Sequence, residues 1–112
     1  MEPQLQEISQ ALVQAVMAAC RQAKAQKQDP GLLAQLLQSG TGLGAWVCQA
    51  LYAPNGQQAA EALSQALETC RESRRLLEEL QAAGGLADPA PLSLCGELER
   101  LLEAARESQG NL

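Results

Sequence analysis

The sequence predicts an all-α protein, an antiparallel up-down-up-down four-helix bundle. It is 46% hydrophobic yet contains one Trp, one Tyr and no Phe, so Leu, Ala and Val must build the core. Ala, Leu, Gln and Glu, which dominate the rest, favour helices over strands. Apolar residues recur every three or four positions in four segments that short breaks separate. At 112 residues the chain is expected to form one domain, residues 1–112, and short connections favour the up-down order.

The first helix is expected over residues 3–28. Pro3 suits the first turn of a helix, where the N–H that proline lacks would have no partner. Asp29-Pro30-Gly31 interrupts the pattern, and Asp29 can cap the next helix with Pro30 at its first position. The expected core face of the first helix consists of Leu5, Ile8, Leu12, Val16, Ala19 and Ala23.

The second helix is expected over residues 30–53, although it contains Gly40, Gly42 and Gly44. Each glycine costs a helix about 1 kcal/mol relative to alanine. We therefore expect the missing Cβ atoms to let a neighbouring helix approach closely. The alternative is that the glycines form a loop between two short helices. The spacing favours one helix with a core face of Leu33, Leu36, Gly40, Leu43, Val47 and Ala50.

The third helix, expected over residues 57–84 after the turn at Pro54-Asn55-Gly56, carries the clearest pattern. Its seam over three heptads consists of Ala59, Leu63, Ala66, Cys70, Ser73, Leu77 and Leu80. Ion pairs three or four residues apart are expected along its exposed side, among Glu68, Arg71, Glu72, Arg74, Arg75, Glu78 and Glu79. Gly84-Gly85 should end this helix. The fourth helix is expected over residues 91–108, with a face of Leu94, Leu98, Leu101, Leu102 and Ala105.

The composition argues against an enzyme. The chain has no histidine, the commonest general base and metal ligand. It contains no G-x-S-x-G motif, no phosphate-binding loop and no carboxylate pair in an apolar surround. We therefore expect neither catalysis nor a cofactor.

Net charge and hydropathy limit the partners. A net charge of −5 argues against a protein that mainly coats a phosphate backbone. No apolar run approaches the roughly 20 residues that span a bilayer, and the N-terminus lacks the basic region of a signal peptide. We expect a cytoplasmic protein that makes no membrane contact.

The four cysteines allow two interpretations. Cys20, Cys48, Cys70 and Cys95 fall one on each helix, and four converging thiolates could hold a soft metal ion or respond to redox conditions. The alternative is that each is a small buried hydrophobic residue. Position favours the second interpretation, because Cys20 and Cys48 both come late in neighbouring antiparallel helices and would lie at opposite ends of the bundle. No metal site is therefore expected.

Residues 35–52, QLLQSGTGLGAWVCQALY, resemble the second-helix signature QLLRSGTSIGANIAEA of the four-helix-bundle proteins encoded in intervening sequences of bacterial 23S rRNA genes. Residues 66–86, ALETCRESRRLLEELQAAGGL, resemble the third-helix pattern of the same family. Trp46 and Gln49 depart from the second-helix signature, because the family has Asn and Glu at these two positions. The positions that match letter for letter include Gln35, Leu36, Leu37, Ser39, Gly40, Thr41, Gly44 and Ala45.

The resemblance implies a homopentamer. The family is similar to the accessory variability determinant of diversity-generating retroelements, which assembles as a five-subunit ring and binds a reverse transcriptase and nucleic acid. An rRNA intervening-sequence protein of unknown role is the alternative, and the sequence leaves open whether the bundle has a partner at all. Aromatic side chains are typical of interface centres, but Trp46 could instead pack within its own bundle. The interface residues expected are Gly40, Leu43, Gly44, Trp46, Val47, Leu51 and Tyr52.

The cations available for contact with RNA or DNA form two groups. Arg21, Lys24 and Lys27 occupy a stretch without acids, and Arg71, Arg74 and Arg75 lie on the third helix. Five copies around a ring would strengthen weak phosphate contacts by avidity. The alternative is that both groups are solvated helix faces.

Overall fold

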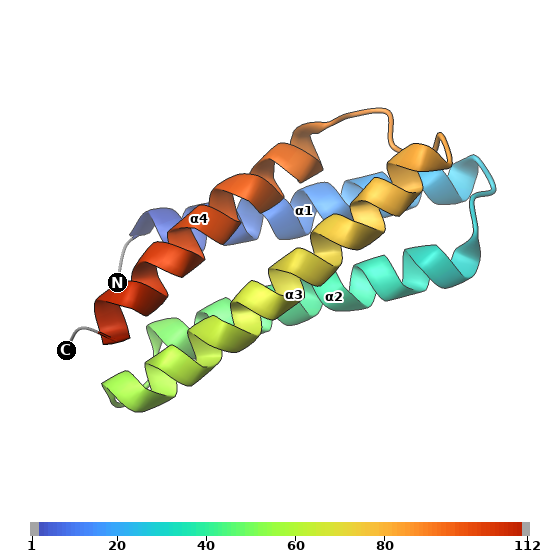
Figure 1. The fold of residues 1–112 in the computed structure, drawn as a ribbon. Coiled ribbons are helices and arrows are strands. Elements are labelled where there is room, and N and C mark those ends of the chain that lie inside the picture. The colour runs from blue at the N-terminus through green and yellow to red at the C-terminus, as the bar shows by residue number, and fades with distance from the viewer. Residues whose placement is uncertain (1–2, 111–112) are drawn as a thin grey trace.

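The computed structural model describes residues 3–110 and contains four helices (Figure 1). They are α1 (Pro3–Ala25), α2 (Pro30–Leu51), α3 (Gly56–Ala82) and α4 (Ala90–Gly110). Residues 3–110 contain no strand, so the all-α prediction is confirmed. Helices α1 and α3 each pack against both α2 and α4, whereas α2 and α4 lie at opposite corners. The body measures 47 × 20 × 19 Å, so its cross-section is nearly square.

The turns gather at the two ends of the body. In Figure 1 the α1–α2 and α3–α4 turns lie at one end, and the α2–α3 turn lies at the other with the first turn of α1 and the last turn of α4. The α1–α2 turn and the α3–α4 turn are in contact. A Cβ added to Gly85 would lie 2.8 Å from the Gln28 side chain and 2.5 Å from Leu80. A side chain at position 85 would therefore have to displace the Leu80 and Gln28 side chains.

Helix α1 ends at Ala25, three residues before the predicted boundary. The N–H of Gln28 donates to the Ala23 carbonyl at 3.0 Å, and that of Lys27 donates to the Lys24 carbonyl at 3.0 Å. This is a Schellman motif, whose left-handed position is usually a glycine. Here Lys27 occupies it with φ of 61°. Because no glycine marks the stop, the sequence alone placed it too late.

The other helix ends follow local signals. The predicted stop of α3 is confirmed: Gly84 has φ of 79°, and the Gly85 N–H donates to the Leu80 carbonyl at 2.9 Å. Asp29 caps α2 as predicted, accepting from the Gly31 N–H at 3.1 Å. Asn55, expected only as a turn residue, also caps α3, accepting from the Gln58 N–H at 2.9 Å.

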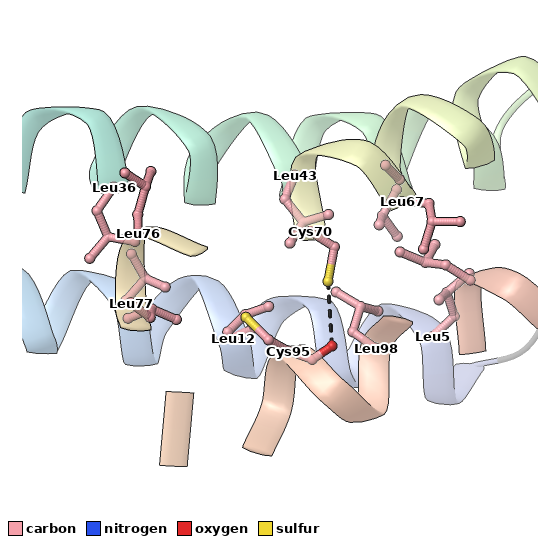
Figure 2. Close-up of a cluster of buried hydrophobic side chains, with 14 of the residues drawn as sticks. Leu5, Leu12, Leu36, Leu43, Leu67, Cys70, Leu76, Leu77, Cys95 and Leu98 are labelled. Atoms are coloured by element: carbon pink, nitrogen blue, oxygen red, sulfur yellow. Dashed lines mark hydrogen bonds between the residues drawn. The ribbon is translucent and has the colours of Figure 1, made fainter. Parts of the chain in front are cut away.

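The core is a continuous cluster of leucines, small residues and two cysteines (Figure 2). All predicted face residues of α2 and α3 are buried. On α1, Ser9 is buried whereas the predicted Ile8 is only half-buried. On α4 the face is shifted: Cys95 is fully buried, and the predicted residues Leu94, Leu101 and Ala105 are half-buried. Helix α4 is therefore rotated from the orientation that its leucine spacing predicts.

One polar contact crosses the α2–α3 seam. Ser73 is fully buried, and its hydroxyl lies 2.9 Å from that of Ser39. Ser39 donates to the Leu36 carbonyl at 3.1 Å, which leaves Ser73 to donate to Ser39. A buried hydroxyl without a partner would destabilise the fold, so this contact fixes α2 against α3.

The glycines of α2 lie within one unbroken helix, so the loop alternative is wrong. A Cβ added to Gly40 would lie 3.0 Å from Val16 Cγ1, and one added to Gly44 would lie 3.2 Å from Val13 Cγ2. The expected close approach of a neighbouring helix is confirmed, and the neighbour is α1. Gly42 is different, since its added Cβ would lie 4.0 Å from Thr69. None of the helices within residues 3–110 is both long and apolar enough to cross a bilayer.

The crowding at Gly40 predicts a difference between two alanine variants. Gly96→Ala in α4, where an added Cβ meets nothing within 4 Å, should stabilise the bundle by about 0.5–1 kcal/mol through helix propensity. Gly40→Ala should gain less, because Val16 must move to admit the methyl group. Urea unfolding of both variants measures the difference, and an equal or larger gain for Gly40→Ala would contradict the close approach.

Candidate protein-interaction surface

The predicted cations of α3 are engaged by carboxylates. Glu99 of α4 lies between two of them, 3.0 Å from Arg71 Nε and 2.6 Å from Arg74 Nη1. Arg71 also lies 3.2 Å from Glu103. Of the ion pairs expected within the helix, those around Arg75 form, at 2.7 Å to Glu72 and 3.4 Å to Glu79. The other two arginines cross to α4, which the spacing within α3 did not indicate.

These contacts place a carboxylate beside each of the three arginines expected to contact phosphate. The hydrogen bond to Glu99 raises the pKa of Arg71, and the hydrogen bond from Arg75 lowers the pKa of Glu72. Each group thus prefers its charged form beside its partner. Arg71, Arg74 and Arg75 thus form an ion-pair network between and along the helices, and a phosphate would compete with these carboxylates for them.

The cations of α1 remain exposed. Arg21 and Lys24 lie in the last two turns of α1, and Lys27 lies in the turn that follows. Within residues 3–110 none of the three forms an ion pair. This group keeps the exposure that a phosphate contact requires.

The seven expected interface residues divide between the interior and the surface. Leu43 and Val47 are 0% and 2% exposed, and Gly40 is also buried. These three hold the chain's own core together and have no surface to offer a second copy. Gly44, Trp46 and Leu51 are half-buried, while Tyr52 is 76% exposed. Of the seven expected interface residues, these four have surface that a second copy could cover.

Both aromatic side chains line one open hollow of about 990 Å³ between the end of α2 and the first half of α3. Trp46 and Tyr52 come from α2 and its C-terminal cap, and Gln49 lies between them in sequence. Glu61 is the only charged lining residue. The α3 side of the hollow is formed mainly by Gln57, Gln58, Ala60, Ala62, Ser64 and Gln65.

A second hollow, of about 530 Å³, lies on the opposite side of α2, against α1. Its α2 side contains Leu51, the exposed Cys48 and Gly44. It has no charged lining residue, and its α1 side is formed by Gln6, Ser9, Gln10, Val13 and Gln14. Two hollows thus flank the C-terminal half of α2. The first has one charged lining residue, Glu61, and the second has none.

Helix α2 itself contains no charged residue in its 22 positions. Its outward stripe includes Leu37, which is 40% exposed, and Met17 of α1 is equally exposed. The other exposed residues of α2 and its C-terminal cap are all uncharged: Pro30, Gly31, Ala34, Gln35, Gln38, Thr41, Ala45, Cys48, Gln49 and Tyr52. The missing charge is visible in the sequence and was the signal that sequence reasoning overlooked.

The four thiols do not converge. Cys20 Sγ lies 3.8 Å from the carbonyl of Leu33, near the start of α2, whereas Cys48 lies near the end of α2. Cys70 and Cys95 meet in the core, where the Cys70 thiol donates to the Cys95 carbonyl at 3.4 Å (Figure 2). Hydrogen bonding to Cys70 and burial raise the pKa of Cys95, and burial raises that of Cys20. Within residues 3–110 no three potential metal ligands cluster.

The chain was compared with known protein families, proteins and structures. Comparison of the chain with protein-family models, curated proteins and solved structures finds no match.

The position of Glu99 predicts unequal effects at two neighbouring carboxylates. The side chain of Glu99 is 14% exposed and accepts from two guanidinium groups, whereas that of Glu103 is 44% exposed and accepts from one. Glu99→Gln should destabilise the bundle by about 1–2 kcal/mol, and Glu103→Gln by less than about 0.5 kcal/mol. Urea unfolding at neutral pH measures both, and equal losses would mean that the network contributes no more than surface pairs do.

Proposed function

We propose that the chain is a non-catalytic scaffold: an antiparallel up-down-up-down bundle that assembles as a homopentameric ring and docks a protein or ribonucleoprotein in the cytoplasm. The partner that the resemblance suggests is a retroelement reverse transcriptase. The observation that carries the proposal is the charge-free outward stripe of α2 between two hollows.

Physical chemistry supports an association surface at this place. Interface centres are depleted in charge and enriched in aromatic residues, because covering a charge without a partner costs several kcal/mol. Tyr52 is 76% exposed, so its ring gains apolar contact only when another surface covers it. The positions of the turns in Figure 1 and the resemblance of residues 35–52 and 66–86 favour the up-down order and the ring.

Nucleic-acid contact is a secondary part of the proposal. The cations that serve it are Arg21, Lys24 and Lys27, because those of α3 are neutralised by carboxylates. A single copy presents only this small group on a chain of net charge −5. Binding is therefore expected to be weak per chain and to depend on several copies acting together.

Oligomeric mass tests the scaffold. Light scattering at two protein concentrations should give five times the chain mass of 11.9 kDa. Tyr52→Ala should weaken assembly roughly 30-fold, the loss of about 2 kcal/mol typical of a central aromatic residue. Trp46→Ala should act in the same direction. Gln81→Ala, exposed and outside both hollows, is the control. A wild-type mass of one chain at both concentrations would refute the scaffold.

Nucleic-acid contact is tested by neutralising the α1 cations. Fluorescence anisotropy with single-stranded RNA and with duplex DNA should show binding that weakens as salt rises. The triple variant Arg21→Gln, Lys24→Gln, Lys27→Gln should lose at least about tenfold in affinity and show a shallower salt slope. Arg75→Gln should bind as the wild type does, since Arg75 is already paired. Equal losses in both variants, or no salt-dependent binding at all, would remove this part of the proposal.

A further inference from the structure

We infer that successive copies join through the two faces that share α2, the α1–α2 face of one copy against the α2–α3 face of the next. Helix α2 then lies nearest the ring axis and α4 faces outward. This inference rests on the proposed homo-oligomer and adds which surfaces form it.

The shape of the bundle fits such a contact. Its cross-section is nearly square, and α2 and α4 occupy opposite corners. The two faces that meet at α2 therefore point about 90° apart. When the outward directions of the two contact faces differ by about 90°, a head-to-tail contact closes a ring of about four copies. When they differ by about 108°, so that the corner at α2 is slightly sharper, the ring closes with five. Either closure places the shared corner toward the axis.

Charge distribution selects α2 for that corner. Equivalent side chains of all copies come closest together at the axis, so any charge there meets like charges. Helix α2 is the only one of the four helices without a charged residue. Most acidic side chains of the chain lie on α3 and α4. With α4 outward, the four carboxylates of that helix are as far apart as the assembly allows, which lowers repulsion between chains of net charge −5.

The same arrangement pairs opposite charges across the contact. It brings α1 of one copy beside α3 of the next, and both helices start at the end where the α2–α3 turn lies (Figure 1). Lys24 follows Gln10, which lines the α1–α2 hollow, by two heptads and so shares its face. At the matching end of α3, Glu72 and Glu79 both pair with Arg75, and together the three residues leave a net charge of −1 opposite Lys24. Lys27 lies beyond the end of α1, in the turn at the tip of the bundle, where a further partner can reach it.

The area is sufficient for a stable contact. A 22-residue helix is about 33 Å long, and a face of the bundle is 20 Å wide, so each copy contributes roughly 660 Å². The total per contact, roughly 1,300 Å², is within the range of specific interfaces. The two hollows are available for side chains of the neighbouring copy, and Tyr52 is the largest exposed side chain beside them.

One matched pair of variants tests the inference. Ala45→Glu places a carboxylate in the middle of the outward stripe of α2, and Ala104→Glu places the same group on exposed α4. Both positions are exposed helix positions, so circular dichroism should show both variants folded, with similar melting temperatures. Light scattering should show that Ala45→Glu dissociates to 11.9 kDa at concentrations where Ala104→Glu retains the wild-type mass.

The outcomes separate the inference from the proposed function. If the wild type is oligomeric and Ala45→Glu assembles as well as Ala104→Glu does, or if Ala104→Glu dissociates instead, α2 is not at the axis and the inference is wrong while the scaffold stands. If the wild type itself is a single chain, the scaffold and the inference both fall.

Discussion

Close approach between helices is the constraint on which this bundle depends. A core without phenylalanine, in which the only tryptophan is half-buried, has no large rings to fill wide gaps. Leucine layers must therefore be pressed together through small residues. Gly40 admits Val16 of α1, and the α3 seam opposes its neighbours with Ala59, Ala62 and Ala66. Well-packed interiors tolerate few voids, so α1 and α2 approach closely, and Gly40 and Gly44 make room for that approach.

Polar and apolar contacts are divided between the two halves of the chain. The C-terminal half of the chain carries the polar cohesion: Glu99 binds Arg71 and Arg74 across the α3–α4 contact, and Ser73 meets Ser39 across α2–α3. The N-terminal half contributes apolar contact and few charges. Ion pairs hold α3 against α4 on one side of the body. Helix α2, at the opposite corner from α4, contributes no ion pair and contains no charged residue. In the proposed assembly, stability and association thus depend on different surfaces.

The fold could be predicted from the sequence, whereas the surface contacts could not. Helix faces with regular three-and-four spacing, as in α2 and α3, follow directly from periodicity. Two predictions, the end of α1 and the ion pairs of α3, were wrong for identifiable reasons. The stop at Lys27 depends on a left-handed residue that is not glycine, which no local pattern signals. The exposed side of α3 was expected to pair within itself, but the rotation of α4 brought Glu99 to Arg71. That rotation also buried Cys95 in place of Leu94. Contacts between helices depend on register, which periodicity within one helix does not determine.

The glutamines around α2 explain how one surface can be exposed in a single chain and covered in an assembly. Gln49, Gln57, Gln58 and Gln65 border one hollow, and Gln6, Gln10 and Gln14 border the other. An amide is well hydrated when exposed, and when covered it can exchange water for hydrogen bonds across the contact at small net cost. A carboxylate or ammonium group in the same place would need a partner of opposite charge. Helix α4, by contrast, carries four carboxylates against two guanidinium groups. In the proposed ring, association between copies is confined to the two faces that meet at α2, and such a head-to-tail contact closes when the angle between the faces fits a whole number of copies.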